Sequence, residues 1–371
     1  MKNFFGLIVA LTVLLSGATV FASEQLIEAS GEYIMDTRLD ETFASATARA
    51  REEAKRAAVE KAGTYVKTYA KTIDFELVED EVEAVASSLL KIQSETGKTD
   101  NAGDNLLKFT VTIKALVDDI SDADLKSLLN DKHALQETTR KYKELQKEYD
   151  ALKAQMDELR RKYDTANETQ RADIKKQVAR NSKNFFALEA TARGNEFYFA
   201  KNYAQALAAY DEAVTLNPNC AEAYNNRGIV KYESGQFAEA VSNYTMAIKL
   251  KADFVDALNN RGNAYAALSQ FQNAAQDLQA AVKLNDNNAV GHNNLGNVYY
   301  SLRNFDAAIQ EYTRAIQLNP AYAEAYYNRG AVYYGKKNYM AALSDIKMSM
   351  SLNLSDNATQ ELYGKILRAF T

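Results

Sequence analysis

The chain has 371 residues and a composition typical of a soluble protein. Its 44 basic and 49 acidic side chains include no long basic block that could neutralise nucleic-acid phosphates, so nucleic-acid binding is not expected. The presence of only two prolines favours a mostly α-helical fold, because proline breaks helix interiors. Two histidines and one cysteine are too few for a zinc site, and no H-E-x-x-H or G-x-S-x-G motif is present. We therefore expect no metal, no cofactor and no enzymatic activity.

Residues 1–22 have the pattern of a secretory signal peptide. Lys2 precedes the apolar run Leu7–Leu15, and small residues lead to a cleavage site after Ala22. An uncleaved membrane anchor is the alternative, although the run is short for a bilayer core of about 30 Å. The pattern predicts an exported protein, periplasmic or secreted, with no embedded segment after cleavage. Cys220 then has no partner in its own chain, and it either stays free or forms an intermolecular disulfide.

Residues 23–130 are expected to form a small α+β domain. The segments 26–35 and 106–117 show partial alternation with β-branched or aromatic residues, which is typical of strands. Between them, the Ala-, Glu-, Arg- and Lys-rich segment 42–70 and the segment 79–92 predict two helices. The predicted order is therefore strand, helix, helix, strand.

This domain shows a resemblance in its small residues. The alanine-rich pattern from Ala48 to Val66, followed by the strand Phe109–Val117, resembles the N-terminal domain of flagellar assembly protein T and related bacterial surface lipoproteins. The resemblance implies a setting in the bacterial cell envelope. An unrelated α+β domain is the alternative.

Residues 131–186 are polar, contain no glycine or proline, and predict a long coiled-coil-like helix. Two series recur every seven residues and alternate in steps of three and four, as the a and d positions of a coiled coil do. The series are Tyr142, Tyr149, Met156 and Tyr163, and Leu145, Leu152, Leu159 and Ala166. This seam predicts either a homodimer through residues 131–166 or a helix that folds back on its own protein, and both remain open.

A 34-residue repeat dominates the second half of the chain. Glycine recurs at positions 194, 228, 262, 296 and 330, and alanine recurs twelve residues later at 206, 240, 274, 308 and 342. Small residues at fixed phases let paired helices pack closely. The pattern resembles the tetratricopeptide repeat over residues 187–354. The resemblance implies five helix pairs in a right-handed α-solenoid, with a capping helix in residues 355–371.

The resemblance also implies a concave groove lined by the first helix of each pair. The residues expected to bind a peptide there are Asn225, Asn226, Asn259, Asn260, Asn263, Asn293, Asn294, Asn297, Tyr300, Asn328 and Tyr334, with Tyr198 and Tyr232 in the same row as the tyrosines. Asparagine amides can pair with both the N–H and the C=O of an extended backbone, and the alternative is that they brace neighbouring helices. Relatives that clamp a C-terminal carboxylate have basic residues at groove positions. Here the corresponding positions hold either Glu222, Asp256 and Glu324 or Asn226, Asn260 and Asn294, which argues against such a clamp.

An arginine precedes the repeat glycine at Arg193, Arg227, Arg261 and Arg329, whereas the fourth repeat has Leu295. We expect these arginine stems to pack and their guanidiniums to reach acidic groups or helix carbonyls, rather than to bind a ligand.

Together these features predict an exported scaffold or adaptor. It would bind a protein or an extended peptide in the groove of the repeats, in assembly of the bacterial cell envelope or a surface apparatus. The alternative is that the N-terminal domain carries an unrecognised ligand-binding or enzymatic site, with the solenoid as a rigid spacer.

Overall fold

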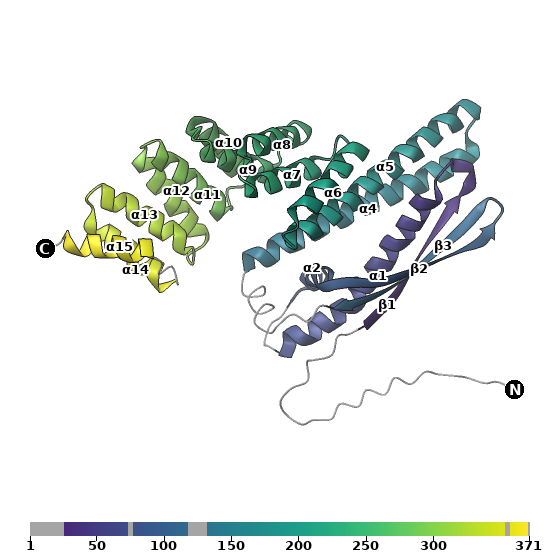
Figure 1. Cartoon of the computed structure of the whole chain (residues 1–371), viewed down its shortest axis with the longest axis horizontal. Helices are drawn as coiled ribbons and strands as arrows, with labels where there is room; N and C mark the ends of the chain where they lie inside the picture. Colours follow the sequence, from purple (N-terminus) through teal and green to yellow (C-terminus); the bar gives the residue numbers. More distant parts are fainter. Residues whose placement is uncertain (1–25, 73–76, 118–131, 353–356, 370–371) are drawn as a thin grey trace, which may run out of the picture. The chain divides into compact units, whose positions relative to one another are not determined.

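The computed structural model describes residues 26–72, 77–117, 132–352 and 357–369 (Figure 1). The predicted signal peptide lies outside these residues. The chain is mostly helical and divides into two compact units, Met1–Ser182 and Lys183–Thr371. In the described ranges, no helix combines the length and the apolar character that crossing a membrane requires.

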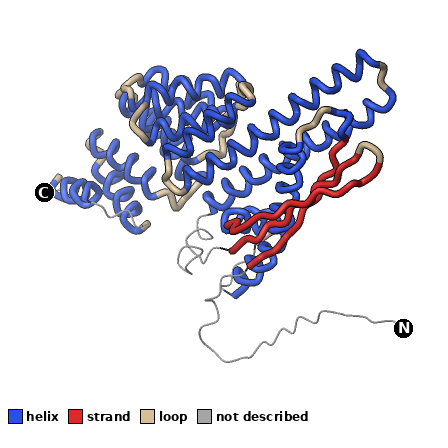
Figure 2. Tube along the Cα trace, turned by 45° about the vertical axis from the view of Figure 1, so that its right-hand side comes forward, coloured by secondary structure: helices blue, strands red, loops and turns tan. Residues whose placement is uncertain are grey.

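The first unit contains an antiparallel sheet in the order β1-β3-β2 (Figure 2). Its strands are β1 (Leu26–Asp36), β2 (Leu90–Gly103) and β3 (Leu106–Val117), and helices α1 (Phe43–Thr72) and α2 (Glu79–Leu89) connect β1 to β2. Strand β2 lies where no strand is predicted, and α2 ends earlier than predicted. Most of β2 is exposed on both faces, so its sequence is mostly polar and lacks the alternation that indicates a strand.

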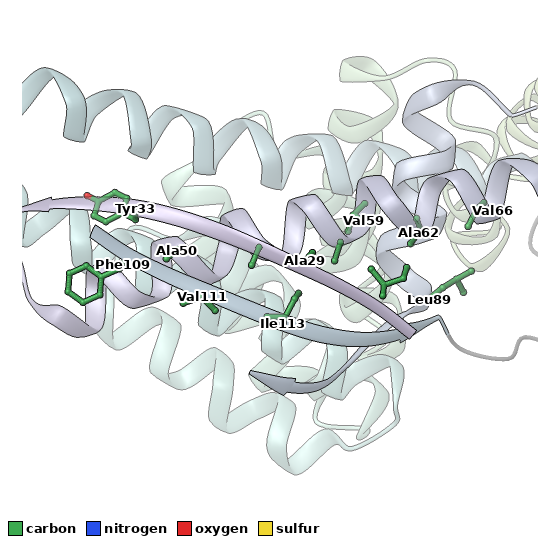
Figure 3. Packing of buried hydrophobic residues seen from close by; sticks show 14 of the residues in the cluster. Ala29, Tyr33, Ala50, Val59, Ala62, Val66, Leu89, Phe109, Val111 and Ile113 are labelled. Atoms are coloured by element: carbon green, nitrogen blue, oxygen red, sulfur yellow. The ribbon is translucent and has the colours of Figure 1, made fainter. Parts of the chain in front are cut away.

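The core of this unit lies between α1 and one face of the sheet (Figure 3). Strand β1 alternates exposed and buried residues, and its buried side faces a row of alanines spaced by four along α1. That row is Ala46, Ala50, Ala54, Ala58 and Ala62. Such small side chains bring the two backbones so close that a Cβ on Gly31 would stand 2.1 Å from the backbone nitrogen of Ala54. The alanine spacing seen in the sequence is therefore a requirement of close packing.

The predicted coiled-coil-like segment is a hairpin of two helices, α4 (Lys132–Thr165) and α5 (Glu168–Phe199). Asn167 accounts for the break between them. Its Oδ1 accepts a hydrogen bond from the backbone N–H of Gln170 (3.0 Å), and Oε1 of Gln170 accepts one from the backbone N–H of Asn167 (2.9 Å). This reciprocal cap starts a new helix at that point.

The seam predicted on α4 is buried inside the chain. Tyr149, Leu152, Met156, Leu159 and Tyr163 are only 1–9% exposed. Three of them pack with Ile174 and Val178 of α5. The hairpin thus corresponds to the fold-back alternative, and a homodimer through residues 131–166 would have to use another face. Helix α5 also continues past residue 187, so the first helix of the first repeat is its C-terminal end.

The second unit stacks helix pairs, each made of a first and a second helix. After the end of α5 come α6 (Tyr203–Leu216), α7 (Ala221–Glu233), α8 (Phe237–Leu250), α9 (Val255–Ala267), α10 (Phe271–Leu284), α11 (Ala289–Ser301), α12 (Phe305–Leu318), α13 (Ala323–Gly335), α14 (Tyr339–Ser351) and α15 (Asn357–Arg368). Each second helix from α6 to α12 packs on its own first helix or on the next one. Helix α15 follows the last pair and buries Ile366 against α14.

The glycine ladder marks where each second helix presses a large side chain onto its first helix. A Cβ on Gly228 would stand 2.6 Å from the ring of Tyr244, and one on Gly262 would stand 2.7 Å from Leu278. Both of these large side chains are at most 1% exposed. The 34-residue period therefore reflects a repeated contact, in which a large side chain of the second helix packs against the glycine of the first helix.

The second helices differ in how they begin. Asn202, Asn304 and Asn338 cap theirs by accepting a backbone N–H, whereas Gln236 and Gln270 make no capping bond. The backbone at Gln270 (φ −89°, ψ 62°) matches that at Asn304 (φ −88°, ψ 73°), so an asparagine there can cap in the same way.

We expect Gln270→Asn to raise the free energy of unfolding by about 0.5–1 kcal/mol, because it satisfies a free N–H in the first turn of α10. Urea unfolding measures the change. Asn304→Gln is the matched control and should lose a similar amount; equal stability of both variants and the native chain would contradict the capping role.

Candidate functional site

The first helices of neighbouring repeats touch one another, α7 with α9, α9 with α11, and α11 with α13. The predicted asparagines lie on the surface that these helices share, which we call the first-helix face. Most of them are partly exposed, but Asn225 and Asn293 are buried, at 4% and 1%.

Asparagine amides connect successive first helices. Nδ2 of Asn260 donates to Oδ1 of Asn225 (3.1 Å), and Nδ2 of Asn328 donates to Oδ1 of Asn293 (3.0 Å). Nearer the start, Nδ2 of Asn226 donates to Oδ1 of Asn195 (2.9 Å). These amides brace the helices, which is the alternative to peptide binding that the sequence leaves open.

This chain of bonds is interrupted between α9 and α11. The equivalent bond would join Asn294 to Asn259, yet Oδ1 of Asn259 is buried without a hydrogen-bond partner. Within the described ranges Asn294 makes no hydrogen bond either. The partly exposed amide of Asn294 is therefore available to another molecule.

Asn263 is also unpaired in the described part of the chain, for a reason that lies in the repeat itself. The hydroxyl of Tyr312 donates to Oδ1 of Asn297 (2.7 Å), fifteen residues before it. Burial raises the pKa of Tyr312, which keeps this phenol protonated as a donor. The residue that takes the place of Tyr312 in the third repeat is Leu278, which has no hydroxyl. Among the described residues, the Asn263 amide thus has no partner.

Asn195 forms the same bond in the first repeat, accepting from Tyr210 (2.7 Å), and it is a member of the face that the sequence interpretation missed. It shares the phase of Asn263 and Asn297, two and three periods earlier, and this spacing is the signal that could have identified it.

The tyrosines expected to face the groove each pack on the first residue of their second helix. The pairs are Tyr198 with Tyr203, Tyr232 with Phe237, Tyr300 with Phe305, and Tyr334 with Tyr339, with ring centroids 5.2–5.9 Å apart. These contacts hold the turn between the paired helices. Tyr300 is still 48% exposed and can add flat area to a contact.

The repeat arginines bind within the chain, as expected. Nε and Nη2 of Arg261 donate to the two carboxylate oxygens of Asp277 (2.7 and 2.8 Å), and Nη1 donates to Thr245 (3.1 Å). Arg329 repeats this geometry with Asp345 (2.8 Å for both bonds). Each arginine therefore ties its own second helix to its first, and Arg261 also reaches the preceding second helix.

The acidic residues at the positions of a carboxylate clamp have partners inside the chain. Glu222 lies 3.6 Å from the Lys251 ammonium, and Glu324 accepts a hydrogen bond from Nδ2 of Asn293 (3.3 Å). Carboxylates at these positions would repel a C-terminal carboxylate.

The first unit contains a cluster of ionisable residues around Glu41. Its side chain is fully buried, and its two carboxylate oxygens share the hydrogen bond that the Tyr33 hydroxyl donates (3.0 and 3.1 Å). Arg49 (3.3 Å) and Arg160 (3.6 Å) lie near the same carboxylate. A carboxylate with no exposed surface does not meet a substrate, so we interpret the cluster as a tie between β1, α1 and α4. Among the described residues, no group of His, Cys, Asp and Glu could hold a metal ion.

Comparison with known proteins identifies the repeats. The family model of the TPR repeat matches residues 194–235, 230–269, 262–302 and 296–337. This part of the chain therefore consists of tetratricopeptide repeats. The resemblance of the N-terminal domain to flagellar assembly protein T is not confirmed, and none of the curated proteins matches the chain.

Similar solved structures include MamA, with 26% identity over 43% of this chain and 94% of that one (TM-score 0.41). YrrB, described as a TPR protein with an unusual peptide-binding site, has 25% identity over 51% and 96% (TM-score 0.44). PilF of Pseudomonas aeruginosa has 17% identity over 51% and 86% (TM-score 0.47). The matched repeats define the class of this part of the chain, an α-helical repeat scaffold.

Proposed function

We propose that the chain is an exported scaffold that binds an extended segment of a partner protein on the first-helix face. The observation that carries the proposal is the pair of unpaired amides at Asn263 and Asn294, on adjacent first helices. An amide can accept from the N–H and donate to the C=O of the same extended backbone. The signal-like sequence of residues 1–22 supports export, and the envelope setting remains part of the proposal.

Tyr300, also on α11, has an exposed ring that can add flat area to a contact. Two asparagine pairs on the same face, Asn260 with Asn225 and Asn328 with Asn293, hold the helices that present the free amides. The partner-binding contacts are therefore expected on α9 and α11, in the third and fourth repeats.

Photo-crosslinking in the native cell tests the proposal. A crosslinking amino acid at residue 263 should capture a partner reproducibly, because this position lies on the first-helix face. The same amino acid at exposed Gln276, on the second helix α10, is the matched control and should capture little. Capture from position 276 with none from position 263 would contradict binding on this face.

A further inference from the structure

The fourth repeat has a different ionic tie from its neighbours. In the second and fifth repeats a tyrosine and an arginine share one helix face three residues apart, and Arg329 lies over the ring of Tyr326 (5.7 Å). In the fourth repeat the residues at these two phases are His292 and Leu295. The acidic partner remains, because Glu311 stands at the phase of Asp345. The cationic position has thus moved by one helical turn, from the arginine to the histidine.

His292 is buried, and both of its ring nitrogens face acceptors. Nδ1 lies 2.7 Å from Oε2 of Glu311 on α12, and Nε2 lies 3.2 Å from the carbonyl oxygen of Asp286, in the loop before α11. An ionised carboxylate and a carbonyl can only accept hydrogen bonds. A neutral imidazole has one N–H and satisfies one of them, whereas the protonated ring satisfies both.

The charged groups around His292 favour its proton. Glu311 faces it from α12, and the Asp286 carboxylate lies 3.5 Å from Nε2. Arg314 of α12 pairs with the Asp286 carboxylate and so fastens the same loop to the fourth repeat.

We propose that protonated His292 fastens the fourth repeat to the loop that enters it from the third, so that the solenoid loosens at this junction when the proton is lost. The equivalent ties made by Arg261 and Arg329 keep their charge at any pH at which the protein folds. The contacts that join α12 and the loop after α10 through His292 therefore depend on pH, whereas the equivalent contacts made by Arg261 and Arg329 do not.

The sign of the effect follows from the pKa of His292. Burial lowers this pKa, but the hydrogen bonds and charges of Glu311 and Asp286 outweigh burial, and the pKa lies above its ordinary value. The stabilisation is complete below the unfolded pKa of about 6.5, and it is lost as the pH rises through the higher folded pKa.

The direct test is an NMR titration of the full chain. It has two histidines, so the ring signals that disappear in His292→Gln belong to His292. We expect these signals to titrate above the ordinary histidine range. Titration below that range would overturn the proposal.

Hydrogen exchange between about pH 5.5 and pH 8.5, a range that spans histidine titration, locates the consequence. After correction for the intrinsic rate, protection of α11 and α12 should fall several-fold with rising pH, while α13 and α14, tied by Arg329, should not follow. Two variants remove the titrating group. His292→Gln should abolish the pH dependence, and His292→Tyr with Leu295→Arg should install the permanent tie of the fifth repeat and abolish it as well. An unchanged pH dependence in both variants, or none in the native chain, would overturn the proposal.

Discussion

Gly31→Ala is expected to lower the free energy of unfolding of the first unit by about 3 kcal/mol. The added Cβ would stand 2.1 Å from the nitrogen of Ala54 and 2.3 Å from the carbonyl oxygen of Ala50. Both are backbone atoms of α1, which no side-chain rotation can move away. The helix and the strand would have to separate, and the alanine row along α1 would lose its packing.

Gly97→Ala is the matched control for this substitution. Gly97 also lies in the sheet, on β2, but no atom stands within 4 Å of a Cβ built there. Urea unfolding should leave this variant within about 0.5 kcal/mol of the native chain. Equal stability of the two variants would show that β1 and α1 are not in backbone contact.

Glu41→Gln is expected to cost about 3–5 kcal/mol, because it removes the one buried carboxylate that faces both Arg49 and Arg160. The amide keeps the shape of the side chain, so the loss reports charge. It removes the carboxylate that Arg49 and Arg160 share beside the ring of Tyr33.

Glu95→Gln is the control for the effect of burial. Glu95 pairs with Arg51 at 2.6 Å, but both side chains are about one-third exposed, and the cost should be no more than about 1 kcal/mol. Thermal and urea unfolding compare the two variants. A loss at Glu41 as small as that at Glu95 would contradict the structural tie between β1, α1 and α4.

The sequence predicts the elements whose packing leaves a periodic record. The glycine ladder is an example, because each repeat glycine packs against a large side chain that follows it at a constant spacing. Strand β2 leaves none, since few of its side chains are buried and no alternation is imposed on it. The break of the hairpin at Asn167 rests on the four residues Asn-Glu-Thr-Gln, a local capping signal that directly follows the last position of the heptad series, Ala166.

The sequence predicts which helix surface carries the candidate site, but not which of its asparagines are free to bind a partner. Asn260 and Asn294 occupy the same phase, yet Asn260 is bonded to the preceding helix and Asn294 is not. Such a difference depends on side-chain geometry that the period does not encode. Asn263 is the exception, because Leu278 fifteen residues later shows that its tyrosine partner is missing.

The central claim is that the unpaired amides bind the partner while the paired ones brace the helices. The most direct measurement is the affinity of the crosslinked partner segment for two variants, Asn263→Ala with Asn294→Ala, and Asn260→Ala, each followed by a melting curve without partner. The first should weaken binding by about 0.5–1.5 kcal/mol for each lost bond at unchanged stability, and Asn260→Ala should mainly lower stability, because it breaks the bond to Asn225. Native affinity in the Asn263 and Asn294 double variant would contradict the account.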